Sequence, residues 1–188
     1  MPANFDFTRL LALSLFFIST TVAVADLPKV PLDRQQFRRP MAIAKLDDAT
    51  AVVANRCGTL SVVDLDEWAV VAEYHLGGRL TDLATVNGLL LVTDAEGSRL
   101  SLINISRKNA QIVYEVPVPT YPVTVQVTPD GSSCTVASKW ARKLTFVSLD
   151  RLAITGTIDL NFSPGEQLHV PSDPRMLVAD VFTGRLAV

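Results

Sequence analysis

Few side chains in this sequence are of the types that perform acid–base, nucleophilic or metal chemistry. The only histidines are His75 and His169, and a lone histidine is usually a packing or surface residue. The motifs HExxH, GxSxG and GxGxxG and the Walker phosphate loop are absent. Paired carboxylates occur in turn-like segments, at Asp47–Asp48 and at Asp64–Asp66–Glu67. These residue types and spacings therefore predict neither a catalytic residue nor a metal site.

The two cysteines do not form a recognisable redox or metal motif. Cys57 lies in the turn-like segment NRCG, whereas Cys134 lies in the strand-like segment SCTVA. No CxxC or CxxCH motif occurs, and two cysteines cannot supply a four-cysteine zinc site. A Cys57–Cys134 disulfide remains open, although the repeat described below places the two residues in units that are not adjacent.

Basic and aromatic residues in short polar turns are the remaining candidates for function. Arginine and exposed aromatic side chains are common anchors in binding surfaces. The candidate binding residues are Arg56, Arg79, Arg99, Lys139, Trp140, Arg142 and Arg185. The alternative is that the charges keep the turns soluble while Trp140 packs onto a neighbouring unit.

The composition is that of a globular chain that can bury a core. Hydrophobic residues make up 48% of the 188 residues, which excludes a disordered chain. Lysine and arginine total 17 and aspartate and glutamate total 19, so the formal charge is −2. This near balance provides no overall field for nucleic acid or for an anionic membrane.

The first 25 residues have the layout of a secretory signal peptide. Arg9 supplies a basic start, residues 10–18 form an apolar stretch, and Ala23-Val24-Ala25 fits a cleavage pattern before Asp26. The apolar stretch is shorter than the roughly 17–25 residues that a membrane-spanning helix needs. We therefore predict that residues 1–25 are removed and that the protein is exported, to the periplasm or the cell surface.

A repeat dominates the rest of the sequence. In each unit an apolar strand is followed by a short polar turn and a second strand with alternating apolar positions. The residues that end the first of these strands are Asn55, Asp94, Ser138 and Asp180, which are 39, 44 and 42 residues apart. A period near 40 residues with about four strands is typical of a β-propeller blade. One blade cannot cover both of its apolar faces, so neighbouring blades must stack.

The predicted fold is all-β, a β-propeller of four-stranded antiparallel blades. In the first unit we expect strands at about 41–46, 50–54, 59–64 and 69–75. Residues 26–39 are interpreted as a linker or an N-terminal strand. The predicted blades span 40–78, 79–119, 120–162 and 163–188, the last being incomplete.

At these residues the sequence resembles the YVTN-type β-propeller repeats of exported bacterial proteins. The resemblance rests on VVAN with LSVVDL (52–55, 60–65) and on TPDG with TVAS (128–131, 135–138). The second unit lacks both the proline and the PDG turn. The resemblance covers residues 40–188 and implies a ring of about seven blades.

About three and a half blades are expected in this chain, because the fourth unit reaches only the start of its third strand. We predict an incomplete propeller that continues beyond Val188. The alternative is a closed ring of four blades in which residues 26–39 supply the outer strand of the fourth unit. Pro28 and Pro31 make that segment a poor strand.

One side of such a propeller carries the candidate binding residues. Within each blade, the turn between the second and third strands and the connection to the next blade emerge on the same side. The residues Asn55, Asp94, Ser138 and Asp180, one per blade, could ring a ligand there. We interpret them instead as hydrogen-bonding the turn backbone.

The sequence predicts an exported binding or scaffold module that presents a loop face to a protein or a small ligand, without catalysis of its own. No cofactor is indicated, no nucleic-acid partner is expected, and no membrane span follows the leader. The alternative comes from the resemblance, because some such propellers are fused to c-type cytochrome domains. On that reading the chain is the propeller part of a larger redox enzyme, with haem bound beyond Val188.

Overall fold

The computed structural model describes residues 25–32, 37–170 and 175–188, and every helix or strand assigned there is a β-strand. The strands form four antiparallel sheets, numbered here as blades one to four in chain order. Blade one contains β2 (Pro40–Lys45), β3 (Thr50–Asn55), β4 (Thr59–Asp64) and β5 (Ala69–His75). Blade two contains β6 (Leu80–Val86), β7 (Leu89–Asp94), β8 (Arg99–Ile105) and β9 (Ala110–Pro117), with β1 (Ala25–Asp26) added at its edge. Blade three contains β10 (Pro122–Val127), β11 (Ser133–Ser138), β12 (Lys143–Ser148) and β13 (Ala153–Asp159), and blade four contains β14 (Pro164–His169), β15 (Met176–Asp180) and β16 (Leu186–Ala187).

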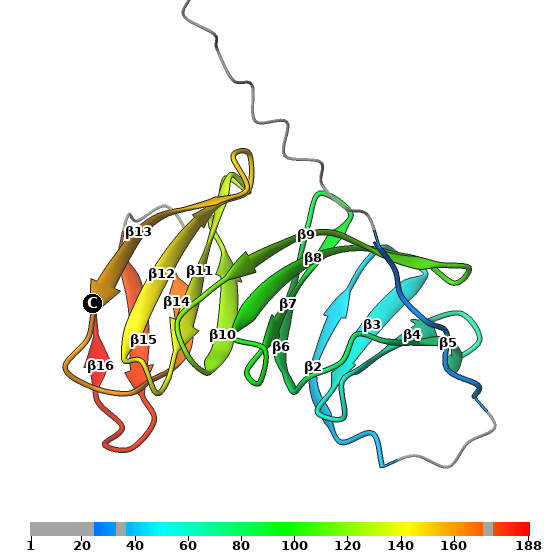
Figure 1. Ribbon diagram of the computed structural model, residues 1–188, viewed down its shortest axis with the longest axis horizontal. Helices are drawn as coiled ribbons and strands as arrows, with labels where there is room; N and C mark the ends of the chain where they lie inside the picture. Colours follow the sequence, from blue (N-terminus) through cyan, green and yellow to red (C-terminus); the bar gives the residue numbers. More distant parts are fainter. Residues whose placement is uncertain (1–24, 33–36, 171–174) are drawn as a thin grey trace, which may run out of the picture.

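Neighbouring blades pack face to face, and the apolar core lies between them. The first strands of successive blades are in contact, β2 with β6, β6 with β10 and β10 with β14. Each of the three interfaces has its own apolar cluster, with contact residues such as Val52 and Leu90, Leu100 and Val136, and Leu144 and Val178. Figure 1 shows the four sheets side by side in a curved row, from β2–β5 at one end to β14–β16 at the other. The predicted all-β propeller fold is therefore confirmed.

The middle strands of the inner blades are apolar on both faces because a blade covers each face. In β7, the sequence LLLVTD is buried at every position except its first. The outer strand β13 has a neighbour on one side only, and nearly all of its residues are exposed. The strands of the first repeat begin and end within a residue of their expected positions. Turn residues and the alternation of apolar and polar residues specify a strand through residues close together in the sequence.

The N-terminal segment runs along the outer strands of blades one and two. Ala25 pairs with Ile112 of β9, and the N–H of Leu27 donates to the carbonyl of Ala110. Further along, the N–H of Val30 donates to the carbonyl of Glu73 in β5. The alternative in which residues 26–39 complete the fourth unit is therefore wrong, because these hydrogen bonds hold the segment against blades one and two. The predicted leader, residues 1–25, lies outside the described residues except for Ala25.

The loops that end on one side of the blades form what we call the turn face. Its described loops are 37–39, 56–58, 76–79, 95–98, 118–121, 139–142, 160–163 and 181–185. The loops 46–49, 65–68, 87–88, 106–109, 128–132 and 149–152 form the opposite face. In the part of the chain that the structure describes, no helix is long and apolar enough to cross a membrane.

Each turn between the second and third strands of a blade contains a residue with positive φ at the same position. Two blades use glycine there, Gly58 and Gly184, whereas the others use Ser98 (φ 50°) and Arg142 (φ 51°). A side chain is strained in this region of backbone conformation. The turn geometry, rather than the side chain, therefore sets the conformation at this position.

We expect Ser98→Gly to raise the free energy of unfolding by about 0.5 kcal/mol, because relief of strain exceeds the entropy that glycine adds to the unfolded chain. Denaturant unfolding of the purified protein measures the change. The reverse substitution at the matched position, Gly58→Ala, should destabilise, since its Cβ would lie 2.9 Å from the carbonyl carbon of Gly77. Equal effects of the two changes would contradict this account of the turns.

Candidate functional site

The structure brings most of the predicted binding residues to the turn face. Trp140 lies in the β11–β12 turn of blade three with Lys139 and Arg142. The other predicted residues on these loops are Arg56 in blade one, Arg79 in the connection to blade two, and Arg185 in blade four. Arg99 is the first residue of β8.

An aromatic stack occupies the middle of the turn face. The rings of Tyr121 and Trp140 are 4.1 Å apart between centroids and nearly parallel, at 13°. The guanidinium of Arg79 lies over the Tyr121 ring, 5.4 Å from its centroid. Trp140 nevertheless keeps 66% of its surface exposed. Trp140 therefore packs on the connection between blades two and three, as the alternative expected, while much of its side chain stays open to solvent.

The backbone holds this stack in place. The N–H of Lys139 donates to the carbonyl of Tyr121 over 2.9 Å, which ties the β11–β12 turn to the connection that precedes β10. Tyr121 itself has a φ of 63°, and Arg39, which also precedes the proline of a first strand, has a φ of 50°. Because the conformation recurs in two blades, it belongs to the connection rather than to one side chain.

A third aromatic side chain lies beside Lys139, on the side of blade four. Phe182 lies in the β15–β16 turn and is 74% exposed. The ammonium group of Lys139 lies 4.9 Å from the centroid of its ring. Tyr121, Trp140 and Phe182 together are called the aromatic shelf. Such rings offer apolar area for a partner, with cations held beside them.

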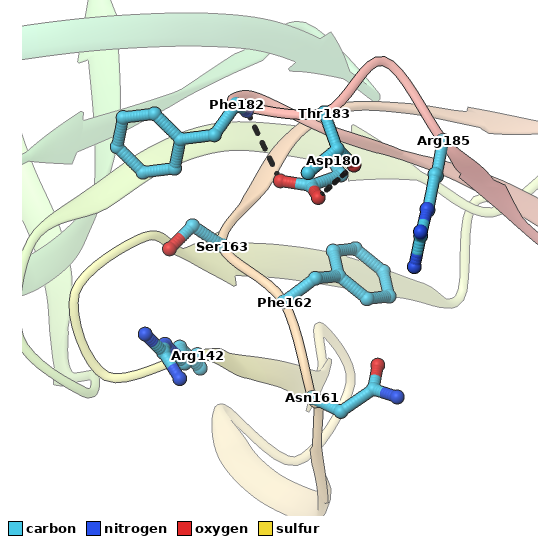
Figure 2. Close-up of a pocket in the computed structure, with 8 residues that line it drawn as sticks. All are labelled: Arg142, Asn161, Phe162, Ser163, Asp180, Phe182, Thr183 and Arg185. Carbon is cyan, nitrogen blue, oxygen red and sulfur yellow. Dashed lines mark hydrogen bonds between the residues drawn. The ribbon is translucent and has the colours of Figure 1, made fainter.

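Three cavities follow the turn face, and each combines arginine with an aromatic ring. The largest, about 480 Å³, is lined by Arg79, Ala95, Glu96, Ser98, Thr120, Tyr121 and Trp140. A second, of about 350 Å³, is lined by Phe37, Arg39, Arg56 and Cys57. The third, of about 270 Å³, is lined by Arg142, Asn161, Phe162, Ser163, Asp180, Phe182, Thr183 and Arg185. Figure 2 shows the third, where Arg142 comes from the β11–β12 turn while Phe182 and Arg185 come from the β15–β16 turn.

Arg99 differs from the other predicted binding residues because it is held by two carboxylates. Its Nε lies 3.1 Å from Asp94, and one terminal nitrogen lies 3.3 Å from Glu115. Its exposure is also limited, at 32% of the side chain. We therefore assign Arg99 to the stability of blade two and leave it out of the binding surface.

The residue that ends the second strand of each blade fixes the turn that follows. The Asp94 carboxylate is fully buried and accepts hydrogen bonds from the backbone N–H groups of Arg79, Glu96 and Gly97. Asp180 accepts from the N–H of Phe182 and from the Thr183 hydroxyl, and these bonds lower its pKa. In the same position, Asn55 bonds to Thr59 and Ser61, and Ser138 bonds to the carbonyl of Pro119. The prediction that these residues hydrogen-bond the turn backbone is confirmed for Asp94 and Asp180, whereas the side chain of Asn55 bonds to two other side chains and that of Ser138 bonds to the preceding connection.

The titratable groups with the largest pKa shifts lie within the blades. Burial raises the pKa of Asp82, in β6, to about 6, and it raises the pKa of the Cys134 thiol to about 12. Cys57 and Cys134 are both free. His75 is exposed at the end of β5, and His169 is half-buried in β14 beside the Thr135 hydroxyl. Within the described ranges, no group of three or more His, Cys, Asp or Glu residues could hold a metal ion.

Comparison with known proteins identifies similar folds. No family model matches the sequence, and no relative was found among curated proteins. The solved structures that it resembles include hydrazine synthase from Kuenenia stuttgartiensis, with a TM-score of 0.63 and 21% identity over 83% of this chain and 50% of that one. The β-propeller domain of Cps50 (Swd1) from Myceliophthora thermophila has a TM-score of 0.66 and 12% identity over 79% of this chain and 53% of that one. A functionally unknown protein from Desulfotomaculum acetoxidans has a TM-score of 0.65 and 15% identity over 82% and 56%.

At these identities the likeness shows the fold alone. The chain is a β-propeller. It spans about half the length of the solved structures that it matches.

Sequence reasoning missed two members of the aromatic shelf. Phe182 follows Asp180 by two residues, as Trp140 follows Ser138, so the repeat register contained the signal for it. Tyr121 lies in a connection whose path the sequence does not reveal. Its stacking on Trp140 depends on how the propeller folds the connection against the β11–β12 turn.

Proposed function

We propose that this propeller is an exported binding module that holds a protein partner on its turn face. The observation that carries the proposal is the aromatic shelf. In it Trp140 stacks on Tyr121, the guanidinium of Arg79 lies over the Tyr121 ring, and Trp140 stays 66% exposed. A large aromatic side chain loses little conformational entropy when a partner covers it. Tryptophan, tyrosine and arginine are also the residues that most often dominate the energies of protein interfaces. The residues of the shelf lie in short loops between strands, and a backbone hydrogen bond from Lys139 to Tyr121 ties two of these loops together, which limits the entropy lost on binding.

The shape of the turn face favours a protein over a small molecule. The three cavities described above are each lined by loops of one blade or of two neighbouring blades, and none of these three combines rings and cations from every blade. A small-molecule site usually encloses most of its ligand, whereas a protein interface spreads over many shallow contacts. The leader-like sequence of residues 1–25 supports an exported protein, which would meet its partner in the periplasm or at the cell surface.

Trp140→Ala together with Phe182→Ala is expected to weaken capture of the partner at least about tenfold, because both rings supply exposed apolar area at the proposed interface. The measurement is capture of exported proteins from the native source by the immobilised protein, quantified against the wild type. Trp68→Ala is the matched control, since Trp68 is an 84% exposed tryptophan in a turn of the opposite face. The proposal fails if the Trp68 variant loses as much capture as the double variant, or if neither change has an effect.

A second candidate function is favoured by one comparison. The likeness to hydrazine synthase supports the alternative in which this propeller is part of a larger exported redox enzyme with a c-type cytochrome domain. The reading frame downstream of Val188 tests this alternative directly. Further blades followed by a CxxCH haem-attachment motif would support it, and an in-frame stop codon would exclude it.

A further inference from the structure

The two faces of the propeller have opposite charge, although the net charge of the chain is only −2. The described loops of the turn face carry the basic residues Arg38, Arg39, Arg56, Arg79, Lys139, Arg142 and Arg185, with Glu96 as the acidic residue among them. The described loops of the opposite face carry Asp47, Asp48, Asp66, Glu67, Asp130 and Asp150, against Arg107, Lys108 and Arg151. The fold therefore concentrates positive charge on the side that holds the aromatic shelf.

The charges of the turn face are largely available to a partner. Arg38 pairs with the buried Glu73, but within the described residues no ion pair engages Arg39, Arg56, Arg79, Lys139, Arg142 or Arg185. Several acids of the opposite face are neutralised or held by their own loops. Asp48 pairs with Lys45, and Asp130 accepts hydrogen bonds from Thr128 and Ser132 that lower its pKa to about 2.

The same combination of groups recurs along the turn face. The three cavities described above pair Phe37 with Arg39 and Arg56, then Tyr121 and Trp140 with Arg79, then Phe162 and Phe182 with Arg142 and Arg185. A cavity on the opposite face, of about 310 Å³, is lined by Leu46, Asp47, Thr50, Ile105, Ser106, Arg107 and Lys108, none of which is aromatic. A ligand that matches the turn face must therefore repeat anionic and apolar groups along its length.

We propose, on the basis of the function proposed above, that the turn face binds an extended acidic segment of the partner protein. Carboxylates of the segment pair with Arg79, Arg142 and Arg185, whose planar guanidinium groups suit bidentate recognition of carboxylates. Apolar side chains of the segment lie against the aromatic shelf between these cations. Complementary charge also speeds association, and it makes binding sensitive to salt.

The probe for this proposal is a fluorescein-labelled synthetic peptide that repeats the triplet Glu-Glu-Phe, titrated with the purified protein and followed by fluorescence anisotropy. The wild type should bind it, and a peptide with lysine in place of glutamate should not bind. The triple variant Arg79→Ala, Arg142→Ala and Arg185→Ala should weaken binding about tenfold or more. The matched variant of the opposite face, Lys108→Ala with Arg151→Ala, should change it less than about twofold.

Thermal unfolding of each variant checks that it is folded, and if the triple variant unfolds early, Arg142→Gln with Arg185→Gln replaces it. The proposal is overturned if the acidic peptide does not bind, or if the opposite-face variant weakens binding as much as the turn-face variant. It is also overturned if polyphosphate completely displaces the peptide that still binds to the triple variant. Capture that depends on Trp140 without binding of the acidic peptide would overturn this inference and leave the proposed binding function standing. If the acidic peptide does not bind and capture of the partner does not depend on Trp140, this inference and the proposed binding function both fail.

Discussion

Asp94→Ala is expected to lower the free energy of unfolding by about 3 to 5 kcal/mol, as the loss of one partner of a buried ionic network does. The carboxylate is fully buried and accepts hydrogen bonds from the N–H groups of Arg79, Glu96 and Gly97. It also pairs with Arg99. Alanine leaves all of these donors without their acceptor in a tight turn. Denaturant unfolding of the wild type and the variant measures the loss.

The glycine that precedes Arg79 provides an internal test of this prediction. A Cβ on Gly78 would lie 2.1 Å from the Asp94 carboxylate, so Gly78→Ala should also be strongly destabilising. In the Asp94→Ala background that collision is gone, and Gly78→Ala should cost only the strain of its positive φ of 67°. Additive losses in the double variant would show that the two residues do not meet as described. Asp48→Ala, in an exposed turn, is the control expected to have little effect.

Asp82→Asn is expected to stabilise the protein at neutral pH by about 2 to 3 kcal/mol and to have little effect near pH 4. Burial raises the pKa of the Asp82 carboxyl from 3.8 to about 6, with a smaller contribution from the negative charge of Glu166. Because the folded pKa lies above the unfolded one, the stability that Asp82 contributes is fully present below pH 3.8 and is lost as the pH rises to about 6. Asparagine carries no charge, and its side-chain oxygen can still accept the hydrogen bond from the N–H of Val125.

The difference in unfolding free energy between wild type and Asp82→Asn, measured from pH 4 to pH 8, isolates this effect from other titrating groups. It should grow with pH and reach a plateau above about pH 6.5. Glu166→Gln is the matched control, since it removes the neighbouring negative charge that raises the folded pKa of Asp82 and should make the difference level off at a lower pH and a smaller value. A difference that does not change with pH would contradict the assignment of the raised pKa to Asp82.

The stability of the blades and the proposed binding surface are connected through Asp94. The carboxylate holds the N–H of Arg79, and the guanidinium of the same residue lies over Tyr121 on the turn face. We therefore expect Asp94→Ala to weaken binding of the acidic peptide as well, because it loosens the connection that positions this cation. The position of Arg79 on the turn face thus depends on a buried acid.

The all-β fold, the stacking of blades and the strand boundaries of the first blade followed from the sequence alone. Turn residues and apolar alternation act over a few residues, so the repeat from Asn55 to Asp180 was enough to predict one sheet per unit. The same register marked Trp140 and Arg142 as turn residues on a shared face. These features are local, and each is specified by residues close together in the chain.

The tertiary structure decided which of these turn residues meet and which face receives which charge. Tyr121 stacks on Trp140, and Arg79 reaches Tyr121 from 42 residues earlier in the chain, because blade packing brings two connections together. The tertiary structure also places Arg99 in ion pairs with Asp94 and Glu115. Acidic and basic residues are interspersed along the sequence and nearly cancel, yet successive turns lie on opposite sides of each sheet. Only the folded blades therefore separate the charges into a basic turn face and a more acidic opposite face.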